Sequence, residues 1–250
     1  MVGVSELAGA RRVIFLWAHS RSASTGFLRM MIERGDVTVL HEPFLALHQG
    51  GQVPVPAPDG GPPALARSGP ELAAALSRLA SRRPVFVKEV LDYRYPEVFD
   101  HLARLAPMTH TFLVRDPRQA ISSHYAVKPA VTCPEIGYER LHELFELLWA
   151  AAGEPPLVIR AEKLLADPAG TVRDYCQAVG LPFLPAALSW APGDRPEWQR
   201  HRGWHLDAIA SSGLAAREHD YPVTIDNSPA LRAFYDHHYP YYERIVQHAR

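Results

Sequence analysis

The sequence predicts an α/β protein: a single-domain parallel β-sheet flanked by helices. Apolar runs suited to buried strands alternate along the chain with segments suited to helices, which is typical of a parallel sheet. Two of these runs end in basic, hydroxyl-rich turns that lead directly into helices. At 250 residues and 47% hydrophobic content, the chain can form one sizeable core. We therefore expect one domain over residues 12–250, preceded by an N-terminal extension at 1–11.

The expected strands are short apolar runs, in chain order 13–17, 37–41, 85–90, 110–114 and 157–160. The expected helices, several of which begin at a proline, are 25–34, 70–81, 96–105, 117–125, 138–151, 168–179 and 228–248. A Pro/Gly-rich stretch between Gln49 and Gly69 has almost no periodicity. Because it is too long for an ordinary connection, we expect residues 45–69 to be a lid or loop insertion, or disordered. Residues 181–204 are similarly irregular.

The first basic turn, His19 to Thr25, follows the first strand and precedes a helix. A strand, a short turn and a helix start together favour an anionic phosphate, because the first N–H groups of the helix point at the ligand. Arg21 and the neighbouring hydroxyls add donors. The alternative is that Ser24 or Thr25 only caps the helix.

The second basic turn, Arg115 to Ser123, follows the fourth strand. Pro117 suits the first helical position and Asp116 suits the cap. Ser123 lies eight residues after Arg115, about two helical turns on, so both side chains can face one phosphate. The alternative to a phosphate site is that Arg115 has only a structural role beside the helix cap Asp116. Together the two turns predict a ligand with two separated anionic groups.

In these two motifs the chain resembles the sulfotransferases that use 3'-phosphoadenosine-5'-phosphosulfate (PAPS). The turn resembles their 5'-phosphosulfate loop, with arginine in place of the lysine of the animal cytosolic enzymes; the matching residues are Arg21, Ser22, Ala23, Ser24, Thr25 and Gly26. Arg115 and Ser123 resemble the family's 3'-phosphate pair. Residues 160–168 resemble a later strand-and-helix element. The resemblance implies a P-loop-like sulfotransferase fold with PAPS as donor, adenosine 3',5'-bisphosphate as product and no metal.

Two departures from the family pattern affect the predicted site. Ala23 stands where the animal enzymes have glycine, so we expect no positive φ there. The lysine-threonine-histidine that supplies their catalytic histidine is here Lys88-Glu89-Val90, which keeps the lysine and lacks the histidine. The resemblance places Lys88 beside the sulfuryl oxygens and Arg21 at the leaving phosphate.

The base must then come from elsewhere, and Glu42 is the leading candidate. It follows the second strand in a glutamate-proline step that resembles the position of the base in some bacterial sulfotransferases. His41 is the alternative, because its ordinary pKa near 6.5 already suits proton abstraction. A third possibility is that Glu42 only caps a helix or pairs with Arg21.

All five expected strands end in or near charged residues, and ligands of open α/β sheets bind outside the carboxyl ends of the strands. The residues are Arg21, Glu42, Lys88, Arg115, Arg160 and Glu162. A later basic stretch offers Arg200 and Arg202 for the 3'-phosphate and Trp204 for stacking or packing, as a partial match to the family's C-terminal loop.

Composition limits the classes of partner. A formal net charge of −1 disfavours a nucleic-acid binder, and no apolar run is long enough for a membrane span. The first residues lack the features of a signal peptide, so we expect a cytoplasmic protein. Cys133 and Cys176 suggest no disulfide or zinc site, and His237-His238 is expected to be a helix face. The sequence does not predict the oligomeric state.

The predicted function is transfer of the sulfuryl group from PAPS to a hydroxyl or amine of a small-molecule acceptor. The Ala- and Arg-rich composition hints at a bacterial enzyme of secondary metabolism. A P-loop kinase is an alternative, although no Gly-x-x-x-x-Gly-Lys-Ser/Thr motif occurs. A non-catalytic sulfotransferase-like binding protein is another.

Overall fold

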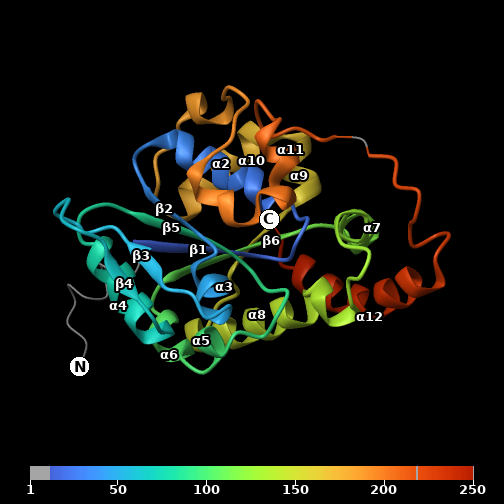
Figure 1. The fold of residues 1–250 in the computed structure, drawn as a ribbon, viewed down its shortest axis with the longest axis horizontal. Coiled ribbons are helices and arrows are strands. Elements are labelled where there is room, and N and C mark those ends of the chain that lie inside the picture. Colours follow the sequence, from blue (N-terminus) through green and yellow to red (C-terminus); the bar gives the residue numbers. More distant parts are fainter. Residues whose placement is uncertain (1–11, 218, 250) are drawn as a thin grey trace.

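A computed structural model describes residues 12–217 and 219–249, so the expected extension at 1–11 lies outside the described residues. Its centre is a five-stranded, wholly parallel sheet in the order β2-β5-β1-β6-β7 (Figure 1). The strands are β1 (Val13–Ala18), β2 (Thr38–His41), β5 (Val85–Val90), β6 (Thr109–Val114) and β7 (Leu157–Arg160). The predicted α/β fold class and single parallel sheet are therefore confirmed.

Helices cover both faces of the sheet (Figure 1). Alternate residues of β1 point to opposite sides: Phe15 and Trp17 belong to one core cluster, and Ile14 and Leu16 belong to the other. The first face is covered by α3 (Pro43–His48), α4 (Gly69–Leu79), α5 (Pro96–Phe99), α6 (Leu102–Leu105), α8 (Tyr138–Ala152) and α12 (Pro229–Val246). The second is covered by α2 (Ser24–Arg34), α9 (Ala161–Ala166), α10 (Pro168–Ala178) and α11 (Leu206–Ile209), and α7 (Pro117–Val127) lies beside the sheet.

The helices differ from the predicted ranges in two ways: α3 and α11 are short helices that were not predicted, and one predicted helix is interrupted. The single helix expected over 96–105 is two short ones, α5 and α6, because His101 has a non-helical backbone (φ −122°, ψ 20°). Three short 3₁₀ helices complete the chain: η1 (Cys133–Ile136), η2 (Pro185–Leu188) and η3 (Pro196–His205). The last two organise much of the segment expected to be irregular. Within the described residues, no helix has the length and apolar character that crossing a bilayer requires.

The Pro/Gly-rich segment after Gln49 forms a β-hairpin instead of a disordered loop. Its strands, β3 (Val53–Val55) and β4 (Ala64–Ala66), pair antiparallel and pack against α4. Val53, Val55 and Ala66 are buried in the main core. For residues 45–69 the disordered alternative is therefore wrong, because alternate apolar residues anchor the hairpin despite its prolines, and residues 45–48 belong to α3. The alternative of a lid stays a prediction.

The sheet reverses its winding direction at β1, whose neighbours are β5 and β6. Such a reversal leaves a crevice at the carboxyl ends of the strands. The chain leaves β1 in a tight turn in which two non-glycine residues have positive φ, Arg21 (66°) and Ala23 (69°). The expectation that Ala23 avoids positive φ is wrong: the turn requires the left-handed conformation whichever residue occupies it.

Replacing Ala23 by glycine should therefore stabilise the fold. A left-handed alanine costs about 1–2 kcal/mol, and glycine loses about 0.5–1 kcal/mol of extra chain entropy on folding. Urea unfolding should show Ala23→Gly more stable by about 0.5–1 kcal/mol. Ala74→Gly, at an exposed position inside α4, is the control and should lose about 1 kcal/mol. Equal destabilisation by both changes would contradict the strained turn.

Candidate functional site

A cavity of about 260 Å³ lies at the carboxyl ends of the strands. It brings together the turn after β1, Glu42 after β2, Lys88 in β5 and Arg115 after β6. Other lining residues come from distant segments: Leu45, Gln49, Asp92, Tyr93, His124, Lys128, Glu135, His201, Trp204, His205, Asp207, Arg217 and His219. Arg160 and Glu162 are not in the lining. Glu162 Oε1 instead accepts a hydrogen bond from the backbone of Asp116 at 2.8 Å.

Two polar side chains, Asp92 and the buried His19, fix the turn after β1. Asp92 accepts hydrogen bonds from Ser20 through both carboxylate oxygens, from the backbone N–H at 3.1 Å and from Oγ at 2.5 Å. His19 accepts the backbone N–H of Arg115 at Nε2 (3.0 Å), so its Nδ1 carries the proton and donates to Ser20 O (2.8 Å). Burial lowers the pKa of His19 to about 3, which keeps this ring neutral. The turn is therefore tied to both β5 and β6.

The N-terminus of α2 faces the cavity without a side-chain cap. Ala23 is the N-cap residue and offers no acceptor, so neither Ser24 nor Thr25 acts as the cap. Thr25 Oγ1 is instead 3.1 Å from His205 Nδ1. Ser22 Oγ is fully buried, lines the cavity and has no hydrogen-bond partner. The free first-turn N–H groups and this unpartnered hydroxyl suit the oxygens of a bound phosphate.

The second basic turn contacts the first. Asp116 caps α7 by accepting the N–H of Arg118 at 2.8 Å, and Pro117 occupies the first turn, as predicted. The Arg115 guanidinium bonds to Gln119 Oε1 and, at 3.2 Å, to the carbonyl oxygen of Arg21. Arg115 lines the cavity.

Arg21 lies at Ser123, which was expected at a separate phosphate subsite. Its Nε donates to Ser123 Oγ at 2.8 Å, and its other nitrogens bond to Trp204 O (2.9 Å) and Asp207 Oδ2 (2.8 Å). One guanidinium therefore links the two turns to the segment around Trp204. Its side chain is directed toward the expected 3'-phosphate residues rather than to the β5 end of the cavity.

A buried ion pair lies at the β5 end of the cavity. Lys88 is 1% exposed, and its ammonium donates to Glu42 Oε1. His41 Nε2 is 3.2 Å from the same oxygen, while His41 Nδ1 bonds to the carbonyl oxygen of Glu197. Burial alone would raise the pKa of Glu42, but the charges of His41 and Lys88 and their hydrogen bonds hold it well below its usual value. Glu42 is therefore ionised at neutral pH, and Arg21 is not its partner.

Glu42 has a left-handed backbone (φ 48°) and is the N-cap residue of α3, yet its side chain does not cap that helix. Glu89 on the adjacent strand does so instead: its Oε2 accepts the N–H of Phe44 at 2.7 Å. Burial, followed by the negative charge of Glu42, raises the pKa of Glu89 well above its usual value. Glu89 therefore supplies the helix cap and leaves the Glu42 carboxylate free for Lys88.

Arg200 and Arg202 do not line the cavity. Arg202 Nε pairs with Asp194 at 2.6 Å, and Arg200 lies near Gly51. Trp204 does reach the cavity, and its ring packs edge-on against His124. The prediction placed the right segment beside the cavity but selected the wrong side chains within it.

Sequence reasoning missed several lining residues. Asp92 follows β5 as Glu42 follows β2, so the strand-end rule could have found it. Asp207, Arg217 and His219 come from a segment without periodicity, and no local signal marks them. Arg217 and His219 lie 4.0 and 3.9 Å from Asp207 Oδ1, beside Arg21.

The role of Glu89 can be tested through the pH dependence of folding. Its raised pKa means that the folded state holds a proton that the unfolded chain releases above about pH 4.5, so its contribution to stability falls as pH rises. Glu89→Gln removes this titration and keeps an acceptor for Phe44. In urea unfolding, this variant should lose less stability than the parent between pH 5 and pH 8.

Glu89→Ala is the matched comparison. It leaves the N–H of Phe44 buried without a partner, and stability should drop by about 1–3 kcal/mol at both pH values. An unchanged pH slope in Glu89→Gln would show that Glu89 is ionised in the folded protein.

Comparisons with known proteins find relatives in sequence and in fold. The chain is 26% identical to branched-chain-amino-acid aminotransferase-like proteins 2 and 1 of Arabidopsis thaliana, over 229 and 228 residues. These matches cover 85% of the chain but only 38% of each relative's length.

Two solved structures share the fold at low sequence identity. A sulfotransferase from Alicyclobacillus acidocaldarius has a TM-score of 0.52 at 12% identity and covers 94% of both chains. The sulfotransferase domain from the curacin biosynthetic pathway has a TM-score of 0.51 at 14% identity, over 90% of this chain and 96% of that one. The family model described as "Sulfotransferase domain" matches residues 12–246, which include every element that forms the cavity. The chain therefore belongs to the sulfotransferase domain family.

Proposed function

We propose that this protein transfers the sulfuryl group of PAPS to a hydroxyl or amine of a small-molecule acceptor. The observation that carries this proposal is that residues of both basic turns line one cavity, which also contains, at its β5 end, the buried Lys88–Glu42 pair. Family membership supports the reaction class. The donor supplies an activated sulfuryl group whose leaving group is a phosphate.

The residues present fit such a donor. The free N–H groups of α2 and the unpartnered Ser22 hydroxyl suit the 5'-phosphate. Arg115 and Ser123 suit the 3'-phosphate, and Arg21 reaches Ser123 as well. Arg217, which lines the same cavity, is a further cation for this end, in the place that we expected Arg200 and Arg202 to fill.

Glu42 is the proposed base, with His41 as the alternative. A carboxylate with a strongly lowered pKa is a weak proton acceptor, so Glu42 must lose part of its positive surroundings to act. Lys88 is the mobile part, because an ammonium on a flexible stem can turn toward a second anion. When anionic ligand oxygens attract Lys88, the pKa of Glu42 rises and its carboxylate can take the proton of the acceptor.

The kinase alternative has no Walker-type lysine after the first turn. Thermal shift distinguishes the classes, because a ligand that binds the folded state raises the melting temperature. Adenosine 3',5'-bisphosphate should stabilise the protein without magnesium. Stabilisation by ATP with magnesium, but not by adenosine 3',5'-bisphosphate, would favour a kinase. Binding of a nucleotide without turnover of any acceptor would favour a non-catalytic binding protein.

Arg115→Ala should weaken binding of adenosine 3',5'-bisphosphate far more than binding of adenosine 5'-phosphate. The change removes a charged donor to the group that only the first nucleotide carries, a loss of about 1.5–3 kcal/mol or roughly 10- to 100-fold in affinity. Calorimetry with both nucleotides measures the difference. Arg118→Ala, one turn along and paired with Asp226 outside the cavity, is the control and should bind both normally. Equal losses for both nucleotides in Arg115→Ala would show that Arg115 does not contact the 3'-phosphate.

Glu42→Gln should lower kcat by about 10²–10⁴-fold, the usual loss for a positioned base. Affinity for adenosine 3',5'-bisphosphate should stay nearly unchanged. Glu197→Gln, an exposed carboxylate near His41, is the control and should keep normal turnover. Near-normal turnover in Glu42→Gln with loss in His41→Ala would assign the role to His41. A loss of nucleotide affinity that matches the loss of rate would make Glu42 a structural partner of Lys88.

A further inference from the structure

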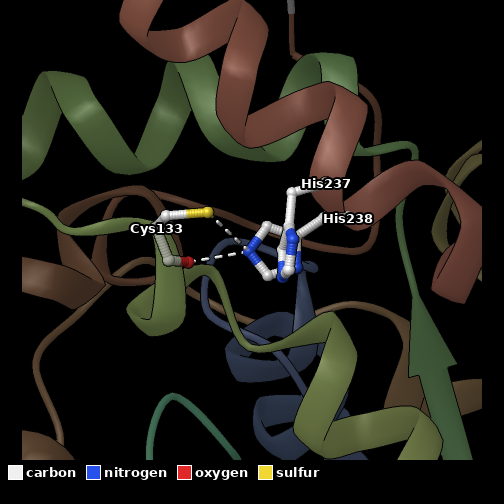
Figure 2. A group of neighbouring side chains, drawn as sticks. All are labelled: Cys133, His237 and His238. Atoms are coloured by element: carbon white, nitrogen blue, oxygen red, sulfur yellow. Dashed lines mark hydrogen bonds between the residues drawn. The ribbon is translucent and has the colours of Figure 1, made fainter.

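A cluster of three metal-ligand types lies outside the cavity lining (Figure 2). Cys133 begins η1, while His237 and His238 lie about one hundred residues later in α12. Cys133 Sγ is 3.6 Å from His238 Nε2, and the ring centroids of the two histidines are 4.7 Å apart. One candidate ligand atom from each side chain lies within 4.8 Å of the others. The fold therefore brings the thiol of Cys133 next to two imidazoles that lie about one hundred residues away in the sequence.

We propose that Cys133, His237 and His238 bind a divalent cation of the zinc class, which fastens η1 to α12. Thiolate sulfur lies ~2.3 Å and imidazole nitrogen ~2.05 Å from zinc, so two such ligands at a tetrahedral angle lie about 3.6 Å apart. The observed distance from Sγ to Nε2, 3.6 Å, matches this value. Mixed sulfur and nitrogen ligands select zinc or cobalt over magnesium or calcium.

The hydrogen bonds of His238 allow its Nε2 proton to be replaced by a cation. Its side chain is fully buried, and Nε2 donates to the carbonyl oxygen of Cys133 at 2.7 Å while also facing the sulfur (Figure 2). Nδ1 is buried and has no partner, so no second bond fixes the tautomer of the ring. A cation can replace the proton on Nε2, and that proton moves to Nδ1. The thiol loses its own proton to solvent, so one proton is released for each cation bound.

The cluster is accessible from one side only. The side chain of His237 is 44% exposed, Cys133 is half-buried and His238 is fully buried. His237 Nε2 lies 3.4 Å from Glu139 Oε2, which can orient the ring or supply a fourth ligand. A cation can therefore enter past His237, with the fourth position left to Glu139 or water.

A cation bound at this cluster would affect the wall of the proposed PAPS cavity through two short chains of contacts. Glu135, two residues after Cys133 in η1, lines the cavity and accepts bonds from Lys128 and Tyr93. On the α12 side, His238 packs against Tyr138, whose hydroxyl donates to the carbonyl oxygen of Arg115. The proposed site is thus structural: it stiffens the support of this wall and contributes no ligand to the reaction.

Cobalt(II) titration of the metal-free, reduced full-length protein tests the proposal, because a thiolate bound to cobalt gives a near-ultraviolet charge-transfer band. We expect one equivalent of this band, release of one proton per cation, and a melting temperature that rises with zinc. Cys176→Ser, which removes the other thiol beside Arg34, is the matched control and should keep the band. Cys133→Ser should abolish both the band and the zinc-dependent shift.

His237→Ala keeps the test decisive if Cys133→Ser fails to fold, because His237 is exposed. The affinity of the His237→Ala variant for cobalt should be at least 10-fold lower than that of the parent protein, while the fold is retained. Absence of the band in the parent protein, or a band that survives Cys133→Ser, would overturn the proposal. So would an unchanged affinity in His237→Ala. None of these measurements depends on sulfuryl transfer, so the proposed function and the cation site can fail independently.

Discussion

The buried Lys88–Glu42 pair is the constraint around which the site is arranged. An ammonium that is 1% exposed is tolerated only beside an anion, and breaking such a pair leaves an uncompensated buried charge that costs about 3–5 kcal/mol. The pair joins the ends of β5 and β2, and it holds the chain after β2 in the left-handed turn at Glu42. Glu89 then has to cap α3, because the carboxylate of Glu42 is engaged by Lys88.

Backbone strain gathers where ligands are expected to bind. The non-glycine residues with positive φ in the described part of the chain are Arg21, Ala23 and Glu42, and all three line the cavity. A left-handed residue persists only where its surroundings determine it strongly. Here those surroundings are the Asp92 and His19 hydrogen bonds to Ser20, and the Lys88 ion pair. The turn after β1 is thus held by Asp92, which follows β5, and by His19, and the turn at Glu42 is held by Lys88 in β5.

The strands of the central sheet could be predicted from the sequence because they are apolar runs bounded by turns, and this signal is local. The sequence was also sufficient for Glu42, Lys88 and Arg115, because parallel strands bring their carboxyl ends to one edge. It failed for α3, which has only six residues and depends on a cap from another strand. It also failed for the 53–66 hairpin, whose prolines hide a short alternation of buried residues.

Two further pairings could not be predicted from the sequence because they depend on tertiary packing. Arg202 was predicted to contact the 3'-phosphate because of its charge, but its side chain forms an ion pair with Asp194, eight residues earlier. The contact between Cys133 and His238 spans 105 residues. No period or motif within a window of the sequence encodes either pairing, since both depend on how the later irregular segments and α12 pack.

The polar groups of the cavity imply that ligand binding proceeds by exchange of partners. Burial lowers the pKa of His19 and His205 to about 3 and that of His124 to about 4, so these rings add no positive charge at neutral pH. Attraction for an anion then falls mainly to the arginines and lysines, several of which already have anionic partners: Arg21 pairs with Asp207, Lys88 with Glu42 and Lys128 with Glu135. A phosphate that takes Arg21 frees Asp207, which lies 4.0 Å from Arg217. In the proposed reaction, an anion that takes Lys88 frees Glu42 beside His41, so the same exchange would also raise the basicity of the proposed base.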